Sequence, residues 1–461
     1  MTNPTPESVA REAGLRHSLP RAQLLMIGLG GAIGTGLFAG SGMAIGYAGP
    51  AVLISYAIAA LIAAAMVLSL SEMAVMHPAA GSFGTYAEIY LNPFAGVVSR
   101  CTYWFAQVIA IAGEATAAGL YMQWWLPEVP LWLWSVGFAA TLVWVNTLSV
   151  NRFGSLEYWL TLIKVSAIVG FIVLGGSRVL GIGAEAPGLA NLTGQEGGFM
   201  PFGLQGVWMA VIVATFSFVG IEVIAVTAGE AEDPRSAVPA ALRGMAIRLF
   251  LFYVLALGIM LTLTPWREVG QTEVSRSPFV TVFSGFGIPY AAGLMNFVVL
   301  SAALSSMNTN LYLTSRMLFS LSRAGFLPAY LGRLGGSATP GLAAWTTGAF
   351  VLLASMLSWF TPRAYNYLFG IALFGAMVIW ILVFLSHFRF RARHAVHDLP
   401  FRTPFFPVPQ ILGLVLLVAL LVTMGLDEGF WRVSWLVGVP WLLLLALFYR
   451  FSKTTSQRSS R

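Results

Sequence analysis

Some ionisable side chains lie within long apolar stretches of this sequence, where a charged group needs a partner or a function. Among them are Glu114, Glu157, Lys164 and Glu222. Inside a lipid bilayer each such group costs about 2.5–3.5 kcal/mol on insertion scales. Lys164 stands near the middle of its stretch, so its side chain is too short to reach either interface. Because carboxylates and amines can load and release protons, these residues are candidates for proton transfer.

Structural roles stay open for the three carboxylates. Glu157 stands near one end of its stretch, where an interfacial carboxylate beside Arg152 fits as well as a place on a proton exit path. Glu114 could pair with an ammonium group or with a polar neighbouring helix, and Glu222 could serve a gate or a proton relay. A polar patch further along fits helix–helix hydrogen bonding at least as well as substrate contact; it comprises Ser305, Ser306, Asn308, Thr309 and Asn310.

A glycine-rich run lies in the first apolar stretch, with five glycines among the nine residues from Gly28 to Gly36. Each glycine costs about 1 kcal/mol relative to alanine inside a helix, so the run predicts a helix that unwinds there. Close helix packing is the alternative reading. A dinucleotide-binding loop is excluded because no strand precedes the run and the first acidic residue downstream is Glu72.

Helices that cross a membrane are needed to position these residues. Of the 461 residues, 58% are hydrophobic and 9% are charged, whereas soluble domains carry about 25% charged residues. This excludes a water-soluble enzyme, a disordered tail protein and a nucleic-acid binder, since the net charge of +7 comes from basic residues spread thinly between apolar runs. The single cysteine, Cys101, excludes a disulfide framework.

Twelve apolar runs approach the roughly 20 residues that a membrane-spanning helix needs. They lie at about 24–46, 50–75, 97–125, 131–150, 155–177, 204–228, 246–264, 286–320, 341–360, 366–386, 410–425 and 431–450. With the N-terminus inside, about nineteen Lys and Arg flank the cytoplasmic ends and about five the outer ends. Twelve spans then leave both termini in the cytoplasm.

A second interruption is expected in the sixth run, where Gly220 stands among polar neighbours. Five spans separate the starts of the two interrupted helices, and because five is odd the second set of five runs inverted relative to the first. Inverted repeats that each begin with a broken helix indicate a secondary transporter. The half-helix ends offer N–H groups to an anion and carbonyl groups to a cation, which together suit a zwitterion.

Three motifs carry a specific resemblance. They read GGAIGTGLF at Gly30–Phe38, FSFVGIE at Phe216–Glu222 with its continuation AGEAEDP at Ala228–Pro234, and LTSRMLF at Leu313–Phe319. Together with the order and lengths of the helices, they resemble the bacterial amino acid permeases of the amino acid–polyamine–organocation superfamily. The resemblance extends from about Leu15 to about Phe451.

The resemblance implies an all-α membrane protein with twelve transmembrane helices and the LeuT-like fold, two inverted five-helix repeats with broken first and sixth helices. We expect a cytoplasmic N-terminal tail at 1–23, the first five-helix repeat at 24–180 and the second, inverted repeat at 204–386. Two peripheral helices at 410–450 and a cytoplasmic tail at 451–461 complete the chain.

The resemblance also implies a substrate carboxylate held by the backbone of the first break, at Gly34, Thr35 and Gly36. Sodium-independent members of the superfamily carry a fifth-helix lysine in the position of a sodium ion, and Lys164 matches it. Our hypothesis is that Lys164 couples transport to the proton gradient.

The amine of the substrate is implied to lie on the sixth-helix break, against carbonyl groups of Phe216, Ser217 and Val219 beside Gly220. Phe218 would then be the aromatic lid between the substrate and the outside.

The sequence therefore predicts a secondary active transporter, not an enzyme, that imports an amino acid into a bacterium by proton symport and alternating access. An amino acid exchanger shares every motif, and an amino acid sensor is less consistent with the short tails. We expect the proton as coupling ion with no other cofactor or metal, and an amino acid and the lipid bilayer as the partners. No nucleic acid and no obligate protein partner are expected, the location is the cytoplasmic membrane, and the identity of the amino acid stays open.

Overall fold

The structure is a computed structural model, and it describes residues 21–79, 81–146, 150–182, 185–227, 234–270, 277–285, 290–335, 339–361, 363–394, 399 and 402–459. All regular secondary structure in these ranges is helical. The first half of the chain forms α2 (Arg21–Ala32), η1 (Gly36–Gly40), α3 (Ser41–Ala48), η2 (Gly49–Ala51), α4 (Val52–Met76), α5 (Ser82–Tyr90), α6 (Pro93–Met122), α7 (Leu131–Asn146), α8 (Val150–Val179) and α9 (Ala190–Thr193).

The second half continues the all-helical pattern. It forms α10 (Gly203–Phe216), α11 (Val223–Thr227), α12 (Pro234–Leu263), α13 (Trp266–Val269), α14 (Pro278–Ser284), α15 (Ala291–Arg323), η4 (Ala329–Gly332), α16 (Gly341–Ser355), α17 (Leu357–Phe360), α18 (Ala364–Arg393), α19 (Val408–Leu426) and α20 (Arg432–Ser459).

Eight helical segments within the described ranges are long and apolar enough to cross a membrane. The first of them, Met26–Met76, contains the first two expected runs, which η2 joins. Three shorter apolar helices, at Leu131–Asn146, Gly203–Phe216 and Ile247–Leu263, fall within three further expected runs. The all-helical, strongly apolar architecture agrees with the expected fold class at this level.

The first apolar segment is interrupted at its glycine run. Helix α2 ends at Ala32, the backbone is irregular at Ile33 and Gly34, and a wide helical turn at Gly36–Gly40 leads into α3. The chain therefore changes its hydrogen-bonding pattern in the middle of a buried segment, which leaves main-chain groups to be satisfied by other helices.

The segment of α10 and α11 is interrupted in the same way, by turns at residues 217–222. Gly220 has φ of +101°, a conformation that a residue with a Cβ rarely adopts. A Cβ at Gly220 would also overlap the carbonyl oxygen of Gly31. The two interruptions are thus packed directly against each other, and Gly220 allows their backbones to meet.

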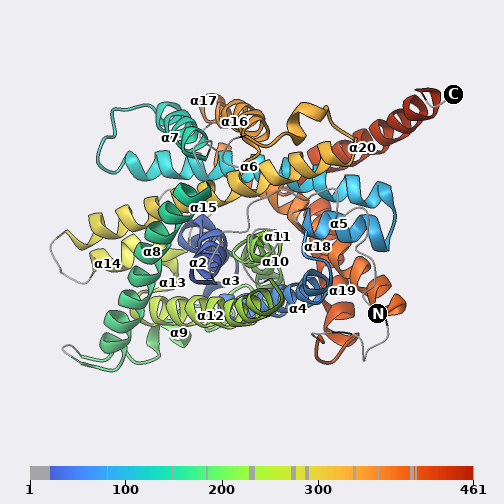
Figure 1. Cartoon of the computed structure of the whole chain (residues 1–461). Helices are drawn as coiled ribbons and strands as arrows, with labels where there is room; N and C mark the ends of the chain where they lie inside the picture. The colour runs from blue at the N-terminus through green and yellow to red at the C-terminus, as the bar shows by residue number, and fades with distance from the viewer. Residues whose placement is uncertain are drawn as a thin grey trace.

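Figure 1 shows the half-helices α2, α3, α10 and α11 near the centre of the bundle, surrounded by longer helices. Among the surrounding helices, α6 packs extensively on α15, while α4 packs on α10 and α12. Helix α8 packs on α2 and α15. Long, continuous helices therefore frame the two broken ones and present side chains to the breaks.

Candidate functional site

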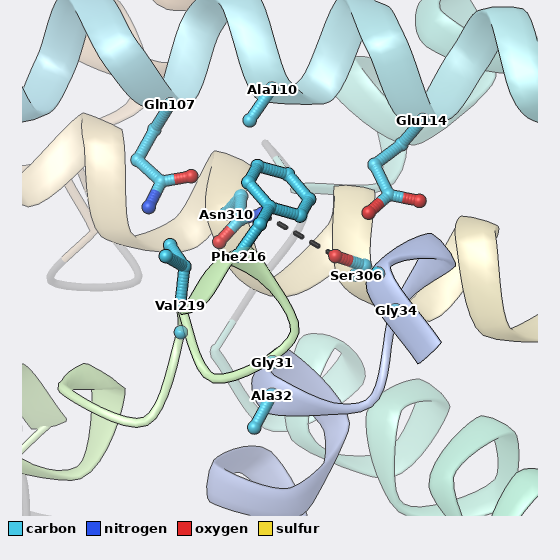
Figure 2. Close-up of a pocket in the computed structure, with 12 residues that line it drawn as sticks. Gly31, Ala32, Gly34, Gln107, Ala110, Glu114, Phe216, Val219, Ser306 and Asn310 are labelled. Atoms are coloured by element: carbon cyan, nitrogen blue, oxygen red, sulfur yellow. Dashed lines mark hydrogen bonds between the residues drawn. The ribbon is translucent and has the colours of Figure 1, made fainter. Parts of the chain in front are cut away.

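A cavity lies between the two helix interruptions and the long helices α6 and α15 (Figure 2). Both breaks contribute backbone and small side chains to it, and the two long helices contribute polar side chains. The lining residues are Gly31, Ala32, Gly34, Gly36, Gln107, Ala110, Glu114, Phe216, Val219, Gly220, Ser306 and Asn310.

The first break presents its backbone to Glu114 of α6. The Thr35 backbone N–H donates to Glu114 Oε1 at 3.3 Å, and the hydroxyl of Tyr365 donates to Thr35 Oγ1 at 3.2 Å. A Cβ at Gly34 would lie 2.8 Å from both Glu114 Oε1 and Ser306 Oγ, so only glycine leaves room for these groups. The backbone at this end of the cavity therefore already binds a carboxylate.

Lys164 of α8 binds the carbonyl end of the first half-helix. Its ammonium donates to the carbonyl oxygens of Gly30 at 2.5 Å and Ile33 at 2.8 Å, and its side chain is fully buried. Unpaired carbonyls at a helix C-terminus carry partial negative charge, which a cation stabilises. The one lysine inside an apolar span thus helps to hold the break open.

Glu157, two turns before Lys164 on α8, is fully buried against α15. It accepts hydrogen bonds from Ser305 Oγ, from Asn308 Nδ2 at 3.0 Å and from Thr161 Oγ1 at 3.1 Å. Glu157 therefore lies in a polar contact between α8 and α15. The side chain of Arg152, its expected neighbour at the interface, lies outside the described part of the chain.

The second break is braced from two directions. Glu222 is buried, and its Oε2 accepts the backbone N–H of Gly220 at 3.1 Å, which closes the turn. The hydroxyl of Tyr253 on α12 donates to the carbonyl oxygens of Ala32 at 3.0 Å and Ser217 at 2.8 Å. Tyr253 therefore bridges the two breaks, and Tyr56 of α4 adds a 3.0 Å contact between its hydroxyl and Ser217 Oγ.

The aromatic ring beside the cavity belongs to Phe216 and not to Phe218. Helix α10 ends at Phe216, and the turn that follows directs Phe218 towards α4 and α12. There its ring lies 6.4 Å from that of Tyr56 and 5.0 Å from that of Tyr253. The expected lid residue is therefore packed in the core, while Phe216 packs on Phe369 and faces the cavity.

The residues singled out from the sequence fall into three groups. Those that line the cavity are Gly34, Gly36, Glu114, Phe216, Val219 and Gly220. Those that lie in the breaks or bind to them, without lining the cavity, are Thr35, Lys164, Ser217 and Glu222. Phe218 and Glu157 lie further away, in the core and between helices.

Other residues at the site carry weak sequence signals or none. The polar patch of α15 splits between two places, since Ser305 and Asn308 bind Glu157 whereas Ser306 and Asn310 line the cavity. Gln107 faces the cavity from α6, two turns before Glu114, and that spacing on one helix face is a signal that could have found it. Tyr253 stands in an ordinary apolar run and gives no such signal.

The Thr35 backbone N–H of the first break binds the Glu114 carboxylate, and the turn of the second break lines the same cavity. The described residues include no group of three or more His, Cys, Asp or Glu side chains placed to hold a metal ion.

Comparison with known proteins identifies the family of this chain. The family model described as "Amino acid permease" matches residues 23–458. The uncharacterized amino acid permease YtnA of Bacillus subtilis is 38% identical, covering 94% of this chain and 95% of the relative. A putative histidine permease of Bacillus subtilis is 36% identical, over 96% and 95%. The aromatic amino acid transport protein AroP of Shigella flexneri is 35% identical, over 96% and 97%.

These matches extend over nearly the whole chain, and the apolar helices described above have the lengths of membrane spans. The protein is a multi-pass membrane protein, and its relatives are transporters and not enzymes. The chain belongs to the amino acid permease family.

Proposed function

We propose that this protein imports an amino acid across the bacterial cytoplasmic membrane by proton symport, with alternating access to a site between the two helix breaks. The observation that carries the proposal is the cavity between two facing helix interruptions, where the Thr35 backbone N–H binds a carboxylate. Broken helices that meet at a substrate site are typical of secondary transporters.

The proposed architecture is the LeuT-like arrangement of twelve spans with both termini in the cytoplasm. The first five-helix repeat spans 24–180, the inverted second repeat spans 204–386, and two peripheral helices lie at 410–450. Its support is the direct packing of the first and sixth broken segments, in which a Cβ at Gly36 would lie 2.9 Å from the Cα of Ser217. In such a fold one helix bundle rocks against the rest around a fixed site.

The substrate carboxylate is proposed to bind the backbone at Gly34, Thr35 and Gly36, and the amine to bind carbonyl groups at Phe216, Ser217 and Val219. Glu114 accepts the hydrogen bond of the Thr35 N–H in the structure. Two ionised carboxylates in one buried site repel each other strongly. Substrate binding therefore favours a proton on Glu114, which would let the two carboxyl groups share a hydrogen bond.

Lys164 is proposed to complete the coupling from the other side of the first break. Its ammonium holds the Gly30 and Ile33 carbonyls, and loss of its proton would remove the positive charge that the half-helix end favours. Protonation of Lys164 and the shape of the break are thereby linked. Glu157 and Glu222, buried on either side of the breaks, are further proposed stations for the proton.

Uptake into liposomes that contain the purified protein tests this mechanism. Under an inward proton gradient, we expect the protein to accumulate amino acid above the external concentration, and Lys164→Gln to lose that accumulation. Lys453→Gln is the matched control, since Lys453 is the other lysine of the chain and stands near its end.

Accumulation by Lys164→Gln equal to that of the wild type would contradict the role of Lys164. Exchange is distinguished by counterflow, because an exchanger moves labelled amino acid inward only against amino acid loaded inside. Strict dependence on internal amino acid would exclude symport.

A further inference from the structure

One polar end of the cavity lies apart from the backbone groups that are proposed to bind the carboxylate and the amine of the substrate. Gln107 on α6 and Asn310 on α15 line it, and Figure 2 shows both beside Phe216, away from Glu114. Ser306 on α15 lies between the two ends of the cavity, because its Oγ is 3.5 Å from Asn310 Nδ2 and also borders Gly34 beside Glu114. Gln107 lies seven residues before Glu114, and Asn310 lies four residues after Ser306, so each pair shares a helix face. Two separate helices therefore direct amide groups into the same part of the cavity.

Both amides present an acceptor without a partner. Gln107 Oε1 and Asn310 Oδ1 make no hydrogen bond among the described residues, although the side chains are 2% and 6% exposed. The Asn310 amide nitrogen makes only a long contact of 3.5 Å with Ser306 Oγ. A buried polar group without a hydrogen-bond partner destabilises the folded protein. Buried polar groups in native structures are nearly always hydrogen-bonded, so these atoms point to a ligand that completes them.

The chemistry of that ligand follows from the groups around it. Two amide oxygens accept hydrogen bonds, and an apolar side chain would leave both of them unpaired. Phe216 offers a flat ring beside them, and Ala110 lines the cavity on α6 between Gln107 and Glu114. A side chain with N–H donors, such as an amide, an imidazole or a guanidine, satisfies the acceptors and packs against the ring.

We infer that Gln107, Ser306 and Asn310 form the side-chain subsite and select amino acids whose side chains carry nitrogen donors over apolar side chains of similar size. This inference rests on the proposed function, because it names the substrate class of the same site. A site built to hydrogen-bond a substrate group discriminates strongly against the analogue that lacks it.

Uptake of labelled amino acids in size-matched pairs tests the inference on the wild-type protein. The pairs are histidine and phenylalanine, glutamine and methionine, and asparagine and leucine. We expect the nitrogen-bearing member of at least one pair to be taken up about tenfold or more faster than its apolar partner. Equal or faster uptake of the apolar member in every pair would overturn the inference while leaving amino acid transport intact.

No uptake of any amino acid would contradict the proposed function, and with it the subsite. The two failures are therefore distinguishable in a single set of measurements.

Substitutions then assign the preference to the subsite. In Gln107→Leu and Asn310→Leu the acceptors are lost, so we expect the ratio of nitrogen-bearing to apolar uptake to fall about tenfold. Asn310→Ser retains a polar group, so we expect it to keep part of the preference. It replaces the leucine variants in this test if they do not fold. Thr141→Val is the control, because Thr141 is exposed on α7 and bonds only its own helix. An unchanged ratio in folded Gln107→Leu and Asn310→Leu would overturn the assignment.

Discussion

At the first break, the side chain of Glu114 takes the backbone donor that a substrate carboxylate would need. Its second oxygen, Oε2, has no hydrogen-bond partner among the described residues. If a substrate carboxylate takes over the Thr35 N–H, a protonated Glu114 can donate a hydrogen bond to that carboxylate. Coupling by Glu114 would therefore depend on its ability to ionise, and not only on its shape.

Glu114→Gln tests this dependence, because it keeps the size of the side chain and removes the titration. We expect proton-driven accumulation in liposomes to fall about tenfold or more, and the rate of uptake to lose most of its pH dependence. Counterflow between equal proton concentrations is expected to persist at a reduced rate, since the cavity and the breaks remain.

Glu128→Gln is the matched control, because Glu128 is exposed in the segment that follows α6. Unaltered accumulation by Glu114→Gln would rule out a coupling role for this carboxyl group.

His77 is a titratable residue outside the spans, directly after the last residue of α4. Its Nε2 contacts the hydroxyl of Tyr90 at 2.6 Å. Burial, aided by the neighbouring His394, lowers the pKa of His77 from 6.5 to about 4. His77 therefore binds a proton near pH 6.5 in the unfolded chain but only near pH 4 in the folded protein. His77 thus favours the folded state above pH 6.5 and loses this contribution as the pH falls towards 4.

The unfolding temperature of the solubilised protein measures this contribution. We expect the temperature to decrease between pH 6.5 and pH 4, and to decrease less in His77→Gln, which has no group to protonate there. Identical slopes for the two proteins would show that His77 contributes nothing to the pH dependence of stability.

Among the elements, the two broken helices depend on the close approach of their backbones. Gly220→Ala adds a Cβ where φ is +101° and where the Gly31 carbonyl oxygen leaves no room. The left-handed conformation alone costs about 1–2 kcal/mol for a residue with a side chain. We expect Gly220→Ala to lose at least about tenfold in transport rate and to unfold at a lower temperature.

Gly258→Ala is the comparison, since Gly258 lies in α12 with no atom within 4 Å of an added Cβ. Alanine is about 1 kcal/mol better than glycine inside a helix, so this variant should be unchanged or slightly more stable. Equal transport by the two alanine variants would refute the requirement for contact between the breaks.

A second element-scale contact ties the end of α4 to α18 and to the segment before α19. The fully buried carboxylate of Glu72 accepts from His387 Nε2 at 3.1 Å, and from Thr403 N at 3.0 Å and Oγ1 at 2.7 Å. Arg391 donates to it from Nη2 at 3.0 Å, and Arg391 Nε lies 2.6 Å from Glu72 Oε1. One carboxylate therefore satisfies donors from two other parts of the chain.

Removing one partner of a buried ion pair costs about 3–5 kcal/mol. We expect Glu72→Gln to lower the free energy of unfolding by about 3 kcal/mol, measured by thermal unfolding in detergent. Glu196→Gln removes an exposed pair with Arg267, 2.9 Å apart, and should cost less than about 1 kcal/mol. Similar losses in both variants would mean that the Glu72 cluster does not stabilise the protein beyond an ordinary surface pair.

The sequence predicts the position of each break, the first from a glycine run that is costly in a helix and the second from Gly220 among polar neighbours. It does not predict how the chain turns within the break. The resemblance implies Phe218 as the lid over the substrate, whereas the turn after α10 packs Phe218 on Tyr253 and leaves Phe216 to line the cavity. Gln107 and Asn310 line the same cavity because α6 packs on α15, and the relative rotation of two helices distant in sequence is not encoded in the pattern of either one.

At the scale of the whole molecule, the exposed surface agrees with the composition, which predicts a protein surrounded by lipid. Large apolar side chains on five different helices are more than half exposed; they include Leu61, Val173, Leu204, Leu353 and Leu443. In water such a surface would associate, whereas in lipid it costs nothing. Buried charged residues lie at the breaks and at the contact of α8 with α15, and others, such as Glu72 and Arg100, are held in ion pairs elsewhere in the bundle.

Movement of protons together with amino acid is the central claim of this account. Liposomes that contain the wild-type protein and a pH-sensitive dye, with equal pH on both sides and the membrane potential clamped, test it directly. Addition of a transported amino acid outside should acidify the interior in step with the uptake of label, and protein-free liposomes should show neither change. Uptake of label with no internal acidification, or uptake only into liposomes preloaded with amino acid, would contradict proton symport.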